Sequence, residues 1–159
     1  MKDLGAYSID IQLLVTLQMV IAATLGAIIG WERDRAGKSA GTRTMALVGT
    51  SSALVVAIGE VLNEGSEFGD PTRALHAVVT GIGFLGAGLI FTIERSREIQ
   101  GVTTAATVFS TVCMGIAVGL GFYITAGAFA LTIIIILRST HILEKAHNAR
   151  TSSKSSPAS

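Results

Sequence analysis

The chain has 159 residues, enough for one domain, and half of them are hydrophobic while only 14% are charged. Soluble domains carry roughly 25% charged residues, so the composition argues against a soluble enzyme and indicates an integral membrane protein. The net charge of only +1 gives no reason to expect a nucleic-acid partner.

Four long stretches of the sequence carry almost no charge, and a membrane-crossing helix needs about 20 mostly apolar residues. The last stretch, residues 102–137, contains 36 uncharged residues, which is too many for one span. Gly119 and Gly121 allow a tight turn in its middle, and one long tilted helix is the alternative. The predicted spans cover residues 11–31, 44–62, 74–93, 102–118 and 121–137.

Basic residues set the orientation of these spans. Ten of the 12 Lys and Arg residues lie in the first loop, the third loop and the C-terminal tail, whereas only Lys2 and Arg73 lie on the other side. By the positive-inside rule, the N-terminus faces outward and the C-terminus faces the cytoplasm. The predicted fold class is therefore an all-α polytopic bundle of five transmembrane helices in the lipid bilayer.

The two ends of the chain are interpreted separately. The N-terminus lacks a basic region and its apolar run is too long for a signal peptide, so we expect the first span to be retained. Residues 1–150 form one membrane domain, and the Ser-rich segment 151–159 is expected to be disordered. His141, Glu144 and His147 are interpreted as surface residues of a cytoplasmic helix and not as a metal site.

Glycines recur at helical spacing within the spans. The segment Gly81-Ile-Gly83-Phe-Leu-Gly86 fits the dinucleotide fingerprint, but that fingerprint follows a strand, and here it lies inside a span. In a membrane, small residues let another helix approach closely. We therefore interpret these glycines as helix-packing positions, with close approach of a ligand as the alternative; they are Gly26, Gly30, Gly81, Gly83, Gly86, Gly88, Gly115 and Gly119.

Charged residues stand directly beside the cytoplasmic ends of the first two spans. Glu32 and Arg33 follow the first span, and Arg43 and Thr44 open the second. They serve either as interfacial anchors or as a polar site folded over the bundle, and the sequence supports both interpretations equally. A buried charge pair there would need partners to offset its desolvation.

A stripe of hydroxyl side chains runs along one face of the predicted fourth helix. Such a face lines a polar path or a cavity, or its hydroxyls bond to carbonyls of their own helix and to neighbouring helices. We slightly favour the second interpretation. The stripe comprises Thr103, Thr104, Thr107, Ser110 and Thr111.

Acidic residues gather on the outer side of the bundle around one base. Hard cations such as magnesium prefer oxygen ligands, so an acidic mouth would attract them, but a solvated acidic loop is the commoner explanation. We assign no firm metal site and no catalytic residues, because no catalytic constellation can be assembled. The outer polar cluster comprises Glu60, Asp70, Arg73 and His76, with Glu64 and Glu67 in the same loop.

Four blocks, spanning roughly residues 20 to 120, together resemble the MgtC/SapB family of bacterial inner-membrane proteins. The third block followed by the fourth is highly specific. The blocks are Gly26-Ala-Ile-Ile-Gly30-Trp-Glu32-Arg33, Ala40-Gly41-Thr42-Arg43-Thr44 with Leu47-Val48-Gly49, Arg73 with Gly81-Ile-Gly-Phe-Leu-Gly-Ala-Gly88, and Gly101-Val102-Thr103-Thr104-Ala105-Ala106.

This resemblance implies a multi-pass inner-membrane protein linked to adaptation to magnesium limitation. It implies either regulation of other membrane proteins, such as a transporter or the ATP synthase, or direct transport of magnesium or another cation. Magnesium is then the ligand to consider, no other cofactor is expected, and the small-residue faces permit a homo-oligomer. Family members often carry a further C-terminal cytoplasmic domain, so we expect no function here that depends on it.

Because successive helices alternate in direction, the matching blocks cluster toward the cytoplasmic half of the bundle. We predict a pocket or docking surface there, in which Arg33 and Arg43 hold an anion or carboxylate and Glu32 orients one of them. Asp70 and Arg73 are expected to pair at the outer end. The same cytoplasmic cluster includes Thr44, Thr103, Thr104 and Thr107.

Overall fold

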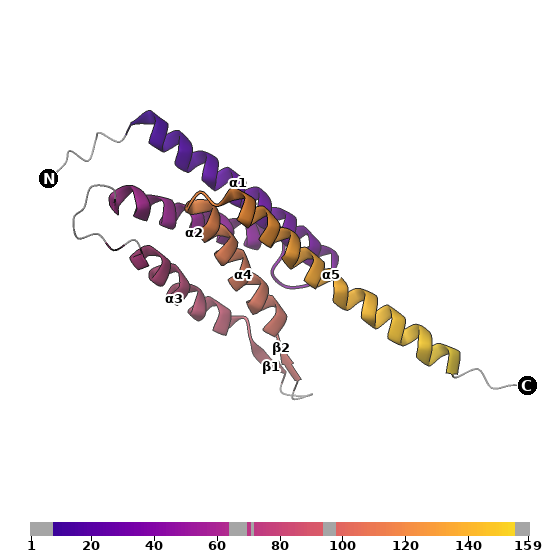
Figure 1. The fold of residues 1–159 in the computed structure, drawn as a ribbon. Helices are drawn as coiled ribbons and strands as arrows, with labels where there is room; N and C mark the ends of the chain where they lie inside the picture. Colours follow the sequence, from indigo (N-terminus) through magenta and orange to yellow (C-terminus); the bar gives the residue numbers. More distant parts are fainter. Residues whose placement is uncertain (1–7, 64–69, 71, 94–97, 155–159) are drawn as a thin grey trace, which may run out of the picture.

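The computed structural model of the chain describes residues 8–63, 70, 72–93 and 98–154, with side chains for 8–63, 70, 72–91 and 99–139. It is a bundle of five helices with one short hairpin (Figure 1), which confirms the predicted all-α class. The elements are α1 (Ile9–Arg35), α2 (Thr42–Asn63), α3 (Thr72–Gly88), β1 (Phe91–Ile93), β2 (Glu98–Gln100), α4 (Val102–Gly119) and α5 (Tyr123–Lys154).

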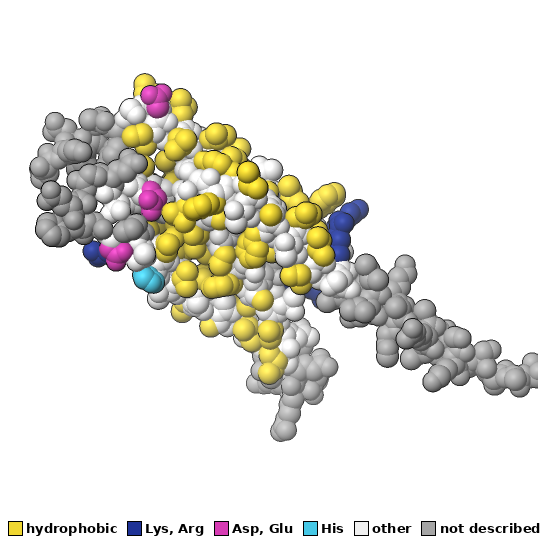
Figure 2. All heavy atoms as spheres, viewed as in Figure 1, with side chains coloured by type: hydrophobic (Ala, Val, Ile, Leu, Met, Phe, Trp, Pro, Cys, Tyr) yellow, Lys and Arg dark blue, Asp and Glu magenta, His cyan; other side chains and the backbone are white. Residues whose placement is uncertain are grey.

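Three of the described helices, α1, α2 and α4, are long and apolar enough to cross a membrane. α5 contributes the shorter apolar segment Tyr123–Ser139, and α3 has 17 residues, or about 25 Å of helix. Figure 2 shows hydrophobic side chains covering the face between one end with most of the visible acidic side chains, together with one basic side chain and a histidine, and another end with basic side chains. This distribution is that of a membrane protein.

Glycines bring the backbones of α1, α2 and α4 into close contact. A Cβ at Gly26 of α1 would collide with the carbonyl oxygen of Met45 in α2, and one at Gly115 of α4 would collide with that of Gly49. Such close approach of backbones drives helix association where lipid is as apolar as the side chains. A Cβ at Gly30 would likewise meet Gly41 and the start of α2, and one at Gly119 would meet Ala53 and Val56 of α2.

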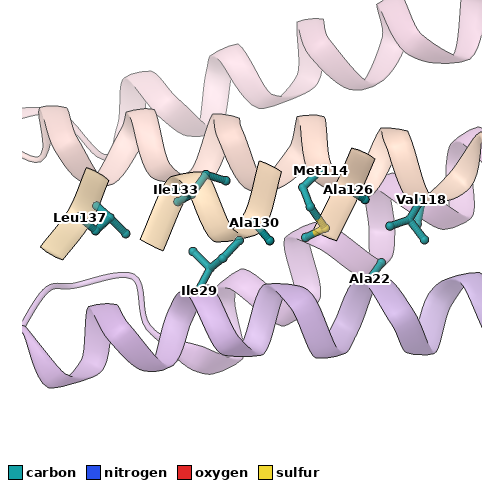
Figure 3. Packing of buried hydrophobic residues seen from close by; sticks show 9 residues of the cluster. Ala22, Ile29, Met114, Val118, Ala126, Ala130, Ile133 and Leu137 are labelled. Atoms are coloured by element: carbon teal, nitrogen blue, oxygen red, sulfur yellow. The ribbon is translucent and has the colours of Figure 1, made fainter. Parts of the chain in front are cut away.

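The largest apolar core of the described chain lies where α1, α4 and α5 face one another, and it also includes Ala53 of α2 (Figure 3). α5 contributes residues at spacings of four, three and four, which is the stripe of one helical face. The buried members of this core are Ala22, Ile29, Ala53, Met114, Val118, Ala126, Ala130, Ile133 and Leu137.

The chain reverses between α4 and α5. α4 ends at Gly119, and Gly121 has a φ of 82°, a conformation that glycine adopts at little steric cost. The N–H of Gly121 donates to the carbonyl of Val118 at 2.9 Å, and that of Phe122 donates to the carbonyl of Ala117 at 2.8 Å. The long uncharged stretch is therefore two helices and not one.

The third predicted span, residues 74–93, differs from the structure. α3 ends at Gly88, and β1 then pairs antiparallel with β2, with Phe91 opposite Gln100. Glycine weakens a helix, and the aromatic and β-branched residues that follow favour a strand. A Cβ at Gly101 would collide with the carbonyl oxygen of Leu89, so the hairpin returns the chain closely past the end of α3.

Several predicted features fall outside the described residues or differ from them. α5 extends to Lys154, so residues 151–154 of the predicted tail are helical, and residues 155–159 lie outside the described part. Glu64 and Glu67 lie outside it as well. The same holds for the side chains of His141, Glu144 and His147.

Candidate functional site

A pocket of about 690 Å³ opens at the end of the bundle where α1 stops, between the α1–α2 loop, the hairpin, the start of α4 and α5. Small-molecule sites have volumes of about 300–1,000 Å³. We call it the basic-end pocket. Its polar lining residues are Glu32, Arg33, Lys38, Ser39, Gln100, Thr103 and Thr104, and its larger apolar ones are Phe91, Ile99, Val102, Ile136 and Leu137.

Arg33 is the most buried charged side chain among the described residues, with an exposed fraction of 2%. Its Nη2 donates a hydrogen bond of 2.6 Å to Oγ1 of Thr104 in α4. Its Nε is buried and has no hydrogen-bond partner among the described residues. A buried donor without an acceptor costs about 1–3 kcal/mol or more when charged, so an acceptor brought by a ligand would be stabilised here.

Helical spacing explains why Arg33 is buried. It continues the face by which α1 packs into the bundle, four residues beyond Ile29 and seven beyond Gly26, and residues at these spacings share one side of a helix. Gln18 lies on the same face, and its Nε2 donates to the carbonyl of Gly119 at 3.2 Å. The sequence-based prediction missed the burial of Arg33 because it treated Arg33 and Arg43 alike.

α4 begins inside the basic-end pocket, since Gly101, Val102, Thr103 and Thr104 all line it. The N-cap residue is Gly101, which has no side chain to satisfy the first N–H groups of the helix. Those groups lack partners within a helix and carry partial positive charge. The pocket therefore combines a helix N-terminus with the guanidinium of Arg33.

Asp34 fixes the loop that forms one wall of the pocket. Its carboxylate accepts hydrogen bonds from the N–H of Thr42 at 2.9 Å and from the hydroxyl of Thr42 at 2.5 Å. A Cβ at Gly41 would collide with this carboxylate, so a larger residue at position 41 would displace the Asp34 side chain from Thr42. The N–H of Lys38 donates to the carbonyl of Arg33 at 3.1 Å. The loop is thus held against the end of α1, an arrangement that sequence reasoning did not find.

Only part of the predicted cytoplasmic cluster lies in this pocket. Arg43 is exposed on α2 and Thr44 is half-buried, and neither lines the pocket. The prediction that Arg33 and Arg43 together hold one anion is therefore corrected. Arg33 lies on the buried face of α1, whereas Arg43 is exposed at the surface. The predicted residues that do meet there are Glu32, Arg33, Thr103 and Thr104.

The hydroxyl stripe of α4 is used mainly within its own helix. The hydroxyls of Thr107, Ser110 and Thr111 donate to the carbonyls four residues earlier, at 2.7, 2.9 and 2.9 Å. Thr104 instead accepts the bond from Arg33. The structure therefore favours internal bonding for most of the stripe, while Thr103 and Thr104 at the start of α4 line the pocket.

The glycines of α3 differ from those of α1 and α4. α3 buries none of its described residues and meets α2 and α4 through side chains such as Val78 and Ile82, which border an apolar groove of about 230 Å³. Apart from the neighbouring backbone of α3 itself, no atom of the described chain lies within 4 Å of a Cβ built at Gly81, Gly83, Gly86 or Gly88. Among the described residues of one chain, no other helix therefore packs against these predicted packing positions.

The outer polar cluster contains a helix cap. The carboxylate of Asp70 accepts hydrogen bonds from the hydroxyl of Thr72 at 2.7 Å and from its N–H at 2.9 Å, and these bonds lower the pKa of Asp70. Asp70 thus caps α3 and does not act chiefly as the predicted partner of Arg73. Glu60 is half-buried and His76 is exposed. Across the described ranges, no three His, Cys, Asp or Glu side chains are placed to hold a metal ion.

Comparison with known proteins adds to this geometry. Residues 19–146 match the MgtC family. YhiD of Escherichia coli K12, described as a putative magnesium transporter, is 36% identical over 132 residues, which cover 80% of this chain and 60% of that protein. Protein MgtC of Salmonella typhimurium LT2 is 37% identical over 130 residues, covering 82% of this chain and 53% of that protein.

The chain spans between 53% and 60% of the length of these curated relatives. An uncharacterized protein of Haemophilus influenzae is 32% identical over 139 residues, covering 84% of this chain and 58% of that protein. No solved structure matches the chain.

Proposed function

The chain belongs to the MgtC family, and from this premise we propose that it acts in the bacterial inner membrane in adaptation to magnesium limitation. It does so by binding a ligand, or a group of a partner, in the basic-end pocket. Binding there regulates other membrane proteins, such as a transporter or the ATP synthase.

The unpartnered Nε of Arg33 is the observation that carries this proposal. Membrane proteins keep charged side chains out of water chiefly where they pair or bind something, and Arg33 is 98% enclosed by the fold, being only 2% exposed. The pocket also lies at the end that holds Arg35, Lys38 and Arg43, which the positive-inside rule assigns to the cytoplasm. A cytoplasmic ligand or partner therefore has access to it.

Growth under magnesium limitation tests the proposal. A strain that lacks its own copy is complemented with the wild type, with Arg33→Gln, with Glu32→Gln, or with Arg43→Gln as the matched surface control. We expect Arg33→Gln and Glu32→Gln to fail to restore growth at equal membrane levels, while Arg43→Gln restores it. Equal growth of all four strains would show that the pocket is not the functional site.

Direct transport of magnesium or another cation is the second proposal, favoured by the description of YhiD as a putative magnesium transporter. An entering ion would meet Glu60 and Asp70 at the acidic end. Purified protein in liposomes decides between the two proposals. Magnesium flux above that of empty vesicles supports transport, and flux equal to that of empty vesicles contradicts it.

A further inference from the structure

The ligand chemistry of the basic-end pocket can be narrowed further. We propose that the pocket binds a phosphate group, carried either by a soluble molecule or by a phospholipid headgroup. The biological role of this binding rests on the proposed function, whereas its chemistry rests on the side chains and the helix end that surround the pocket.

Two kinds of donor converge in the pocket. The bond from Nη2 of Arg33 to Oγ1 of Thr104 holds the guanidinium beside the first turn of α4, whose N–H groups are free to donate. A helix N-terminus together with an arginine binds phosphate well, because a phosphate offers several acceptor oxygens to donors in fixed positions. The hydroxyls of Thr103 and Ser39 line the same space.

The buried Nε of Arg33 is the second, independent indication of a ligand. It has no acceptor among the described residues, although the side chain is almost fully buried. The side chain lines the pocket, so an oxygen placed there completes the hydrogen bonds of the guanidinium. An apolar ligand would leave this donor unsatisfied.

The charge of the pocket fits a phosphate better than a carboxylate. Arg33 and Lys38 contribute two positive charges and Glu32 one negative charge, and a helix N-terminus adds about half a positive charge. The sum, about +1.5, matches a phosphate monoester, which carries about −1.5 to −2 at neutral pH. A single carboxylate would leave part of the positive charge uncompensated.

The size and depth of the pocket fit a larger molecule that carries the phosphate. The volume of about 690 Å³ leaves room for an attached group, and Phe91, Ile136 and Leu137 offer it an apolar wall. The pocket also opens beside Glu32 and Arg33, just where the apolar stretch of α1 ends after Trp31. Lipid phosphates lie at this boundary between hydrocarbon and water, so both sources reach the pocket.

Isothermal titration calorimetry measures binding to the full chain directly. The full chain in a phosphate-free maltoside detergent is titrated with inorganic phosphate, with glycerol 3-phosphate, with acetate, and with mixed micelles that contain phosphatidic acid. We expect a saturable heat change with phosphate compounds and a much weaker response to acetate. A response to phosphatidic acid alone identifies a headgroup, and a response to the soluble phosphates identifies a soluble ligand.

Variants locate the binding. Lys38→Gln is expected to weaken phosphate binding about tenfold, as loss of one charged hydrogen-bond donor does, and Arg33→Gln to abolish it. Arg43→Gln, at the same end but outside the pocket lining, is expected to bind like the wild type. Because Arg33→Gln removes a buried side chain, the exposed Lys38 keeps the test valid if that variant does not fold.

Three results would overturn the phosphate inference: no response to any phosphate compound, equal affinity for acetate, or equal weakening by Arg43→Gln and Lys38→Gln. A different set of results would contradict the proposed function. If phosphate binds as expected while Arg33→Gln supports normal growth under magnesium limitation, the inference stands and the proposed function falls. If no phosphate compound binds while Arg33→Gln abolishes that growth, the phosphate inference falls and the proposed function stands.

Discussion

Nη2 of Arg33 donates a hydrogen bond of 2.6 Å to Oγ1 of Thr104, a residue 71 positions away along the chain. This bond joins the last turn of α1 to the first turn of α4. It holds the guanidinium at the first turn of α4, while the Nε of Arg33 has no hydrogen-bond partner among the described residues. Arg33 therefore links the packing of α1 on α4 to the proposed ligand site.

Thr104→Val tests whether the hydrogen bond between Arg33 and Thr104 stabilises the fold. Valine has nearly the shape of threonine but cannot accept the bond from Arg33, and an unsatisfied buried donor costs about 1–3 kcal/mol. We expect a lower melting temperature of the purified protein in detergent. Thr132→Val is the control, because the Thr132 hydroxyl is exposed and donates only to the carbonyl of Ala128. Equal melting temperatures for the two variants would contradict the account.

Gly26→Ala tests the close packing of α1 on α2. The added Cβ would collide with the carbonyl oxygen of Met45, and overpacking of this kind costs about 1–3 kcal/mol. Gly127→Ala in α5 is the matched control, since nothing in the described chain lies within 4 Å of its Cβ and alanine favours helix over glycine. Chemical denaturation in detergent should show a loss for the first variant and none for the second.

The acid dependence of stability tests the cap of α3. Hydrogen bonds from Thr72 lower the pKa of Asp70 below its usual value of 3.8. Its ionised form therefore stabilises the fold above pH 3.8, and this contribution is lost as the pH falls through the lower folded value. Asp70→Asn keeps the cap without the titration, so its melting temperature should fall less on acidification. Parallel falls for both proteins would count against the cap.

Accessibility of single cysteines tests the proposed orientation. In a Cys113→Ala background, Ser39→Cys at the basic end should react with a membrane-impermeant thiol reagent only after the cells are opened. Asp70→Cys at the acidic end should react in intact cells. The physical reason is the excess of Lys and Arg at the basic end, which membrane insertion retains in the cytoplasm. The opposite labelling pattern would reverse the assignment of the two ends.

The bundle was predictable from sequence because its main determinants are local. Uncharged stretches of sufficient length predict helices, and Gly119 and Gly121 predict the turn between α4 and α5. The hairpin after α3 was missed because a run of apolar residues reads as a continued span. The strand β1 depends on contacts with residues further along the chain, and there Gly101 lies against the carbonyl of Leu89.

The pocket was only half predictable, for a related reason. Sequence places Glu32, Arg33 and Arg43 at the same end of the bundle, but it does not say which of them turns inward. The helical phase of α1, from Gly26 through Ile29 to Arg33, contains that information once the buried face is known. The capping of α2 by Asp34 depends on how the loop folds, and sequence alone gave no sign of it.

The density in the basic-end pocket tests the central claim most directly. The protein should be extracted from native membranes with its surrounding lipid, without added phosphate, and its structure determined experimentally. We predict compact density within hydrogen-bond distance of Nε of Arg33 and of the N–H groups at the start of α4. A pocket closed by the protein's own side chains, or filled only by an acyl chain, would contradict the claim that this pocket binds an anionic ligand.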